Sequence, residues 1–246
     1  MNNAKGVLEY LNYQHNQKFK IGKYAKVISK DYPEYNFIGK VIYMQELESQ
    51  LFVTLQINND CVSYPAEDLE IIDKIRGFEK ISSIKADIPL PQRKTKKSAG
   101  YDIAVIHPKV YEMLLDGYTL EEAWSRVSQM NGKAVVTKAP NQCSIILPTG
   151  VKAYMLDDEW LDIIVRSNSG IKKGIRQANP HSAIDADYYN NANNEGHIFF
   201  AIHNDSIVFD APMIVIAQGI FLKYLAADTG NLDNERVGGI GSTNGR

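Results

Sequence analysis

The chain has 246 residues, enough for two domains, and its apolar fraction of 44% and charged fraction of 23% are typical of a folded globular protein. A net charge of −2 gives no overall basic surplus, so the composition argues against binding of nucleic acid by charge. The longest apolar run, 213–222, is too short to cross a bilayer, and the amino terminus lacks the apolar stretch of a signal peptide. We therefore expect a cytoplasmic protein.

The first predicted domain covers residues 1–77 and consists of short strands after an expected short helix at Val7–Tyr13. The strand segments share a high content of β-branched and aromatic residues: Tyr24–Ser29, Gly39–Tyr43, Leu51–Ile57, Cys61–Tyr64 and Leu69–Ile72. This pattern resembles that of a small SH3-like β-barrel, which closes its own edges. Because the charges of the segment nearly balance, we expect packing or an unidentified protein partner for this domain rather than nucleic acid.

Two other features of the sequence favour a plain structural role. Cys61 and Cys143 lie far apart and without the spacing of a zinc site, so we expect reduced core residues rather than a disulfide. The one dense basic run, 93–97, favours a solvated linker over a phosphate site.

The second predicted domain, residues 78–228, is mostly strands, with a helical insert at about 108–131. Pro108 near the start and Gly117 past the end delimit a first helix, and Thr119 and Glu122 have the spacing of a capping box for a second. The apolar positions of the second helix recur at helical spacing and are expected to pack on the β core: Leu120, Ala123, Trp124, Val127 and Met130. Strands are expected at 134–136, 143–147, 161–165, 197–202 and 213–222.

The third segment, residues 229–246, is rich in glycine and has few large apolar side chains. Such a segment cannot offset the entropy lost on ordering by its own contacts. It is either a disordered terminus or an arm that becomes ordered over a ligand.

Three polar clusters are ambiguous when each is taken alone. The segment Arg166–Gly170 follows a strand and could hold phosphate or form an ordinary turn. Asp185 and Asp187 alternate with apolar residues, so both would lie on one face of a strand, as a metal site, a base with a neighbour, or an exposed edge. The glycine-rich run 236–243 could form a backbone nest for phosphates.

The order of these clusters resembles the five motifs of the homotrimeric dUTPase (dUTP pyrophosphatase) family, in its phage and Gram-positive-like form with an added N-terminal module. The resemblance covers roughly residues 81–246. The matching segments are, in order, Ala99–Asp102, Arg166–Ser167, Asn179 with Ala183–Tyr188, Ile216–Gln218 and Gly239–Thr243. Leu147–Gly150 also matches, between the first and second motifs.

The resemblance implies an all-β jelly-roll (β-clip) subunit that assembles as a homotrimer with active sites shared between chains. It implies hydrolysis of dUTP to dUMP and pyrophosphate with Mg²⁺, which lowers dUTP and supplies dUMP. Asp185 matches the general base that activates the attacking water. Asn179 matches the side chain that binds the uracil edge, and Tyr188 the ring that packs under the deoxyribose.

The remaining matches concern the triphosphate. Ser167 and Gln218 match residues that contact the phosphate chain, and Arg166 would neutralise charge there and pair with Asp102. Asp102 matches an acid that acts on Mg²⁺ through its water shell. Residues 229–246 would close the site as a lid. Its matching residues are Arg236 on the γ-phosphate, with Ile240, Gly241, Ser242 and Thr243 over the nucleotide.

Three departures from the family pattern stand out in the sequence. Ile240 occupies a position where the family usually has an aromatic ring, and the spacing from Arg236 to Gly239 is one residue shorter than in many members. The segment Tyr189–Gly196 replaces a short glycine-containing turn. Two alternatives remain open: a dCTP deaminase-related enzyme, and a dUTPase-fold regulatory or protein-binding factor.

Overall fold

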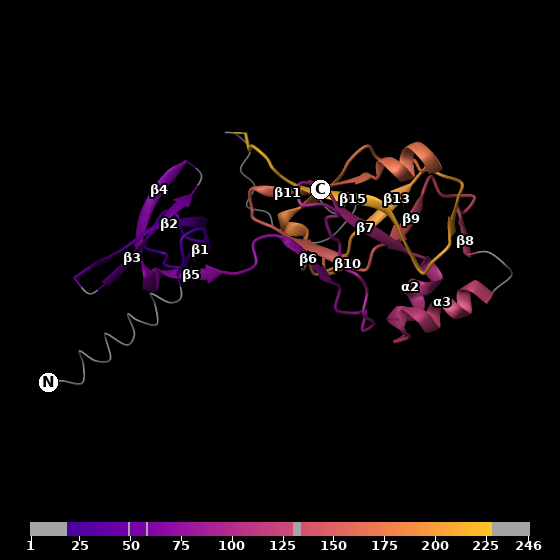
Figure 1. Ribbon diagram of the computed structural model, residues 1–246, viewed down its shortest axis with the longest axis horizontal. Coiled ribbons are helices and arrows are strands. Elements are labelled where there is room, and N and C mark those ends of the chain that lie inside the picture. Colours follow the sequence, from indigo (N-terminus) through magenta and orange to yellow (C-terminus); the bar gives the residue numbers. More distant parts are fainter. Residues whose placement is uncertain (1–18, 49, 58, 130–133, 228–246) are drawn as a thin grey trace. The chain divides into compact units, whose positions relative to one another are not determined.

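The structure is a computed structural model that describes residues 19–48, 50–57, 59–129 and 134–227. The expected helix at Val7–Tyr13 lies outside the described residues. The chain separates into two compact units, Met1–Ile75 and Arg76–Arg246, each with its own hydrophobic core (Figure 1). This division lies two residues before the boundary expected from the sequence.

The described part of the first unit is one antiparallel sheet in the order β4-β3-β2-β1-β5. Its strands are β1 (Tyr24–Val27), β2 (Ile38–Leu47), β3 (Gln50–Ile57), β4 (Asp60–Pro65) and β5 (Leu69–Ile72). The alternation expected of a half-buried strand is clear in β3, where Leu51, Val53 and Leu55 are buried. The five predicted strands are confirmed, and the SH3-like barrel stays a prediction.

The second unit is mostly β, which confirms the predicted fold class. Its described strands are β6 (Gly77–Lys80), β7 (Tyr101–Ile106), β8 (Ala134–Thr137), β9 (Ile145–Pro148), β10 (Val151–Tyr154), β11 (Glu159–Val165), β12 (Ser182–Asp185), β13 (Phe199–Ile202), β14 (Ser206–Phe209) and β15 (Met213–Lys223). They form a four-stranded sheet, β12-β11-β15-β7, and the antiparallel pairs β10-β6, β13-β9 and β14-β8. The predicted strands correspond to β8, β9, β11, β13 and β15. β6, β7, β10 and β14 were not predicted. Three of them have only four residues with a charged or polar member, which give little periodic signal, and β7 was read only as part of a motif.

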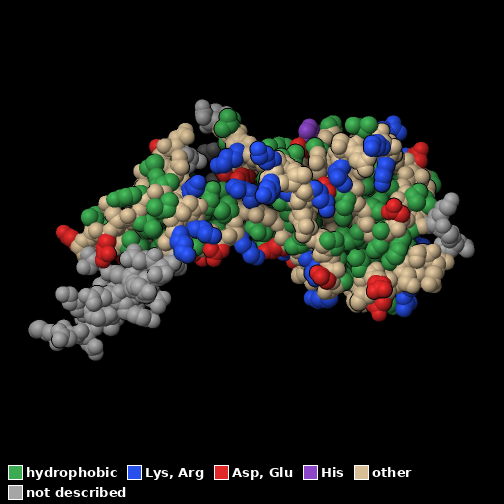
Figure 2. All heavy atoms as spheres, viewed as in Figure 1, with side chains coloured by type: hydrophobic (Ala, Val, Ile, Leu, Met, Phe, Trp, Pro, Cys, Tyr) green, Lys and Arg blue, Asp and Glu red, His purple; other side chains and the backbone are tan. Residues whose placement is uncertain are grey.

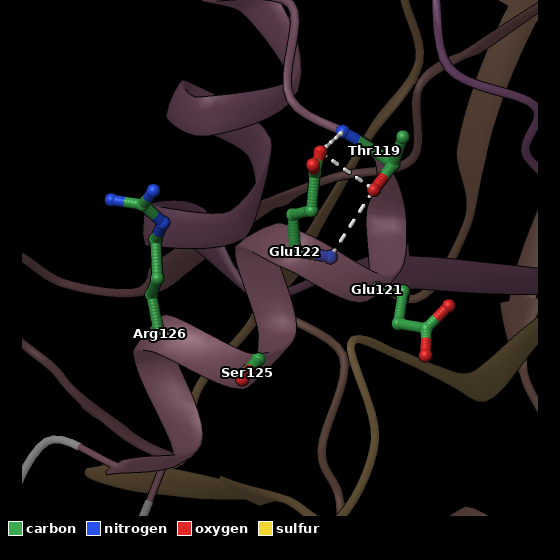
Figure 3. Close-up of a pocket in the computed structure, with 5 residues that line it drawn as sticks. All are labelled: Thr119, Glu121, Glu122, Ser125 and Arg126. Atoms are coloured by element: carbon green, nitrogen blue, oxygen red, sulfur yellow. Dashed lines mark hydrogen bonds between the residues drawn. The ribbon is translucent and has the colours of Figure 1, made fainter.

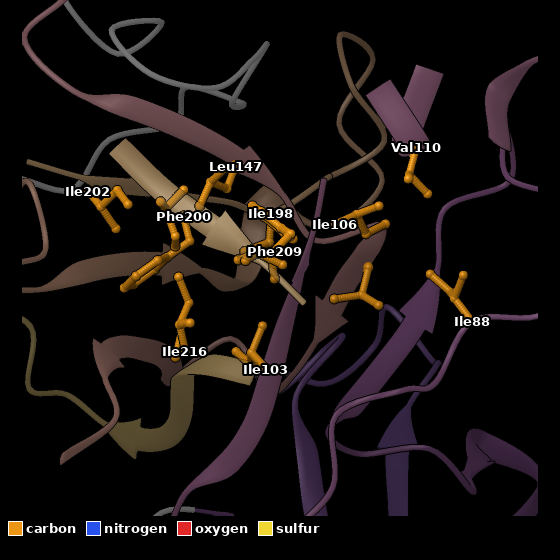
Figure 4. Packing of buried hydrophobic residues seen from close by; sticks show 14 of the residues in the cluster. Ile88, Ile103, Ile106, Val110, Leu147, Ile198, Phe200, Ile202, Phe209 and Ile216 are labelled. Carbon is orange, nitrogen blue, oxygen red and sulfur yellow. The ribbon is translucent and has the colours of Figure 1, made fainter. Parts of the chain in front are cut away.

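The strands and the helical insert enclose a single core (Figure 4). Ile103 of β7, Leu147 of β9 and Phe200 of β13 are fully buried in it, so burial of apolar surface joins strands from separate ladders. The helices α2 (Pro108–Leu115) and α3 (Leu120–Gln129) contribute buried side chains to the same core: Val110, Leu114, Ala123 and Val127. The predicted insert and its packing are therefore confirmed, except for Met130, which lies outside the described residues.

The capping box at the start of α3 is present as the sequence predicts. Thr119 N–H and Thr119 Oγ1–H donate to Glu122 Oε2 at 2.9 and 2.8 Å, and Glu122 N–H donates to Thr119 Oγ1 at 3.2 Å (Figure 3). These bonds satisfy backbone N–H groups that a helix start otherwise leaves free.

Exposed surface residues correct one expectation. Cys61 and Cys143 are free thiols, as expected, but both are exposed rather than in the core. Cys61 lies on β4, at the edge of the first sheet, and Cys143 lies in the irregular segment before β9. Figure 2 shows acidic and basic side chains interspersed over the face in view.

The turn Leu147–Gly150 is fixed by a buried histidine. Gly150 has a φ of +74°, and an added Cβ there would lie 2.7 Å from Ile88 Cδ1, so both conformation and space require glycine. Gly150 N–H donates to His197 Nε2 at 2.9 Å, which leaves the ring proton on Nδ1, 3.3 Å from Tyr111 Oη of α2. Burial lowers the pKa of His197 to about 4, despite the opposing charge of Glu195.

This shift predicts a loss of stability on acidification. The unfolded chain takes up a proton at His197 near its ordinary pKa of 6.5, whereas the folded chain does so only near 4. The free energy of unfolding should therefore be highest above pH 6.5 and fall by about 3 kcal/mol as the pH decreases to 4, at 1.36 kcal/mol per pKa unit. Urea unfolding of the wild type and of His197→Gln, at one protein concentration, measures the difference. Parallel pH profiles for the two proteins would contradict the assignment.

Arg76 makes a contact that fixes where the second unit begins. Its guanidinium donates to both carboxylate oxygens of Glu159, with Nε 3.0 Å from Oε2, and Glu159 is 4% exposed. Glu159 Oε2 also accepts from Leu156 N–H at 3.2 Å. A buried carboxylate that loses its cation is strongly destabilising.

A truncated chain that begins at Ile75 should therefore fold, whereas Arg76→Gln in that chain should lose roughly 2 kcal/mol of unfolding free energy. Urea unfolding with size-exclusion chromatography tests both chains. Insoluble protein from the Ile75 start would show that the first unit is required for folding of the second.

Candidate functional site

Four of the predicted site residues come from one sheet, β12-β11-β15-β7. Asp185 ends β12, Arg166 directly follows β11, Gln218 lies in β15 and Asp102 in β7. The register places Gln218 opposite Asp102 on one side and opposite Ile164 on the other. Asp102, Gln218 and Arg166 therefore lie together at one end of β11.

The expected ion pair between the first and second motifs is present. Arg166 Nε is 3.1 Å from Asp102 Oδ1, and the Asp102 side chain is 10% exposed. Asp102 Oδ2 is buried and, within the part of the chain that the structure describes, has no hydrogen-bond partner. One oxygen of this carboxylate thus remains as an acceptor beside the arginine.

Gly100 explains why the first motif contains glycine. A Cβ at Gly100 would lie 2.7 Å from Gln218 Oε1 and 3.1 Å from its Cδ. The space that glycine leaves is filled by the Gln218 side chain, which is held beside Asp102 by the pairing of β15 with β7.

Ser167 lies exposed at the start of a turn that the sequence did not predict as helical. The chain forms a π-helical turn at Asn168–Lys172, and Gly170 N–H donates to Arg166 O at 2.8 Å. The predicted short loop is thus an ordered turn. Turns of this type occur at functional sites, where they direct a side chain away from the regular path.

The segment before β12 carries Asn179. Its side chain is exposed, its Nδ2–H donates to His181 O at 2.5 Å, and its Oδ1 accepts from Ser182 Oγ at 3.3 Å. Asn179 is therefore held at the start of the strand that ends in the exposed Asp185.

The expectation that Asp185 and Asp187 lie on one strand is wrong. β12 ends at Asp185, and Ala186–Tyr188 forms a 3-10 turn. The alternation of acidic and apolar residues is the same in both cases, so the sequence pattern did not reveal the turn. Asp185 thus ends the strand, whereas Asp187 lies in the turn that follows it.

Tyr188 follows this turn and is 8% exposed. Its Oη donates to His197 O at 3.0 Å and accepts from Asn194 Nδ2–H at 2.7 Å. The segment Tyr189–Gly196, which departs from the family pattern, therefore contacts a predicted site residue.

His181 and Asp162 were missed by the sequence analysis. Asp162 of β11 is 6% exposed, and its Oδ2 is 2.8 Å from His181 Nδ1. The signal was an acid within the apolar strand 161–165, which must be paired when buried, and a histidine two residues after Asn179. The pair fixes the ring of His181 beside the segment that carries Asn179.

Asp185 does not meet the cluster of Asp102, Arg166 and Gln218 within one chain. Asp185 pairs with Trp160, near the start of β11, whereas Arg166 follows its end. Six residues of extended strand separate the two positions by about 20 Å. The site residues that the structure describes thus form two groups within one chain.

Other parts of the site are not placed. Arg236, Ile240, Gly241, Ser242 and Thr243 lie outside the described residues. Within the described ranges, no group of three His, Cys, Asp or Glu side chains could hold a metal, and no helix is long and apolar enough to cross a membrane. A pocket beside α3 is lined by Thr119, Glu121, Glu122, Ser125 and Arg126, none of them a predicted site residue (Figure 3).

The pair of Arg166 and Asp102 gives a prediction that is independent of activity. Arg166→Met should lower the free energy of unfolding by roughly 2 kcal/mol, because it leaves Asp102 as an unpaired charge. The loss should be smaller than for a fully buried pair, because Arg166 is partly exposed. Urea unfolding of Arg166→Met, Asp102→Asn and the double variant measures this. Additive losses in the double variant would show that the pair contributes nothing.

Comparison with known proteins supplies the family. No model of a protein family matches the chain. The deoxyuridine 5'-triphosphate nucleotidohydrolase of Lactococcus lactis subsp. lactis is 37% identical over 176 residues, which cover 69% of this chain and 98% of that protein.

Solved structures of dUTPases also match. The enzyme from Streptococcus mutans is 32% identical, with a TM-score of 0.46 over 62% of this chain and 99% of that one. A mutant dUTPase from phage phi11 of S. aureus, described with a structural Mg(II) ion, is 15% identical, with a TM-score of 0.38 over 65% of this chain and 97% of that one. The sequence identity to the Lactococcus protein over nearly its whole length is the deciding observation: the chain belongs to the dUTPase family.

Proposed function

We propose that this protein hydrolyses dUTP to dUMP and pyrophosphate, in the cytoplasm, and that Asp185 is the base. The observation that carries the proposal is the match to a deoxyuridine 5'-triphosphate nucleotidohydrolase along 98% of that protein's length. The position of Asp185 supports its role. It lies exposed at the end of β12, where a carboxylate can hold a water that points away from the sheet.

The reaction in this proposal is a single displacement. The oxygen of the attacking water bonds to the α-phosphorus while Asp185 accepts a proton from that water. Pyrophosphate leaves with the electrons of the broken P–O bond. A carboxylate is a weak base at neutral pH, so most of its effect must come from holding the water in line. A strand end fixed by the β11 register provides such a position.

Asn179 and Tyr188 select the nucleotide in this proposal. Asn179 offers an amide to the uracil edge, and a pocket that hydrogen-bonds one base leaves its polar groups unpaired with another. Tyr188 packs under the deoxyribose, where its ring excludes a 2'-hydroxyl.

The triphosphate would be bound by the second group of residues. Arg166 supplies a cation, and Ser167 and Gln218 supply hydrogen bonds at the same end of β11. Residues 229–246 would close over the nucleotide, with Arg236 on the γ-phosphate, Ser242, Thr243 and Gly241 as donors, and Ile240 covering the base.

The residues present fit a Mg²⁺ ion that is held mainly by substrate phosphates and waters. Asp102 has one buried oxygen without a hydrogen-bond partner in the described part of the chain, which suits an acceptor for metal-bound water. When bound, the ion would neutralise phosphate charge. Arg166, paired with Asp102, holds that carboxylate in place.

We further propose a homotrimer with shared sites. Because about 20 Å of strand separates Asp185 from Arg166, a single chain cannot bring both to one α-phosphate. Exposed apolar side chains on the second unit, such as Ile146 and Val208, offer surface for contacts between copies. Each site would then take Asp185 from one chain and the phosphate-binding residues from another.

Asp185→Asn should abolish turnover while nucleotide binding persists, because the amide keeps the shape of the carboxylate but cannot accept the proton. The measurement is pyrophosphate release from dUTP with Mg²⁺, beside calorimetric binding of a non-hydrolysable dUTP analogue. Asp210→Asn, the same change at another exposed acid, is the control and should retain activity. An Asp185→Asn protein with near wild-type turnover would refute the mechanism.

The same assay with dUTP, UTP, dCTP and dTTP tests the substrate. We expect release from dUTP far above the other three. Deamination of dCTP, seen as ammonia release without pyrophosphate, would favour the related deaminase instead.

A further inference from the structure

The segment Tyr189–Gly196 folds back on Tyr188 and holds it from two sides. The consequence for selectivity rests on the proposed function, in which Tyr188 excludes a 2'-hydroxyl. Exclusion by contact needs a ring that cannot move aside, because a pocket that can yield rejects an added hydroxyl only weakly.

The hydroxyl of Tyr188 is fixed by one donor and one acceptor. Asn194 Nδ2–H donates to Tyr188 Oη at 2.7 Å, and Tyr188 Oη–H donates to His197 O at 3.0 Å. His197 is itself fixed, since its ring accepts from Gly150 N–H and lies against Tyr111 Oη. The far end of the tyrosine is thus tied to the core and to the helical insert.

The backbone of Tyr188 is held by the same segment. Asn191 Nδ2–H donates to Tyr188 O at 2.8 Å. Gly196, with a φ of +80°, lies so close that an added Cβ would be 2.6 Å from Tyr188 O. Both ends of the residue are therefore in contact with 189–196 or its neighbour His197.

The two asparagines also hold each other. Asn191 Nδ2–H donates to Asn194 Oδ1 at 2.8 Å, Asn194 N–H donates to Asn191 Oδ1 at 3.2 Å, and Gly196 N–H donates to Asn194 Oδ1 at 3.2 Å. With its Oδ1 used in this way, the Asn194 amide is oriented so that its Nδ2 points at Tyr188 Oη.

The segment is anchored to the body of the unit through Glu195. Its carboxylate accepts from Lys152 Nζ at 2.9 Å and from Ser82 N–H at 2.9 Å. Lys152, on β10, is 7% exposed, so this anchor pairs a buried ammonium group with a partly exposed carboxylate. Asn190 and Glu195 adopt positive φ values of 56° and 64°; asparagine tolerates this conformation, whereas glutamate keeps it only where the surroundings hold it.

We propose that Asn194 is a positioning residue for Tyr188, and that the clamp formed by Asn191, Asn194, Gly196 and His197 sets the discrimination between dUTP and UTP. It acts through the rigidity of the tyrosine and touches no substrate. Removal of the clamp frees the ring to retreat from a 2'-hydroxyl, so the selectivity falls more than the turnover of dUTP.

The test is the ratio of kcat/KM for dUTP to that for UTP, measured on the full chain by pyrophosphate release with Mg²⁺. Asn194→Ala should lower this ratio by roughly 10-fold or more, the scale of a small misplacement of a positioned group. Asn193→Ala is the matched control, because it removes the same type of side chain from an exposed neighbour. Asn193 contacts Asn191 through its backbone N–H, which the substitution keeps, so the ratio for this variant should not change.

A double-mutant cycle separates positioning from general stability. Tyr188→Phe lacks the clamped hydroxyl, so Asn194→Ala should have no further effect on the ratio in that background. Asn194→Leu keeps the branched shape of the amide but can neither donate to Tyr188 nor accept from it, and should lower the ratio even if Asn194→Ala does not fold.

An unchanged ratio in both Asn194 variants would overturn the inference, as would an equal further fall in the Tyr188→Phe background. An equal fall in kcat/KM for dUTP and for UTP, together with a lowered Tm, would show that Asn194 has a purely structural role, and this too would overturn the inference. A wild-type chain that releases no pyrophosphate from dUTP would instead refute the proposed function, and this inference with it.

Discussion

The register of β11 is the constraint on which the site depends. β11 pairs with β12 on one side and with β15 on the other, and its inward residues Leu161 and Ile163 are fully buried, so a shift by one residue would move them out of the core. This register places Asp185 at one end of the strand and the partners of Arg166 at the other. The distance between these two ends is the reason for proposing a site that is assembled from several chains.

Each buried charged side chain in three pairs of the second unit has a polar partner, and each pair fixes a different part of the candidate site. Asp102 with Arg166 joins β7 to the end of β11, Asp162 with His181 holds the segment before β12, and Lys152 with Glu195 anchors the segment after Tyr188. A buried ion pair adds little to stability over apolar packing, but it penalises any arrangement that separates its members. These pairs therefore matter more for the positions of the candidate site residues than for the stability of the hydrophobic core.

The helical insert is part of the same network. Tyr111 of α2 lies against His197, which accepts from Gly150 N–H and whose carbonyl accepts from Tyr188 Oη. Along the sequence these are three separate features: an insert, a glycine turn and a motif tyrosine. In the structure one buried histidine, its pKa lowered by burial, contacts all three.

The sequence by itself determined the fold class, the two helices with their capping box, most of the strands and the order of the motif residues, because each depends on local periodicity or on residue identity. Only the tertiary structure decided the end of β12 at Asp185, the exposure of both cysteines, the pairing of Asp162 with His181 and the clamp on Tyr188. The pairing of Asp162 with His181 depends on which segments meet across paired strands, and no local pattern encodes that. The turn after Asp185 and the clamp on Tyr188 lie close in sequence, but they are irregular and so give no periodic signal.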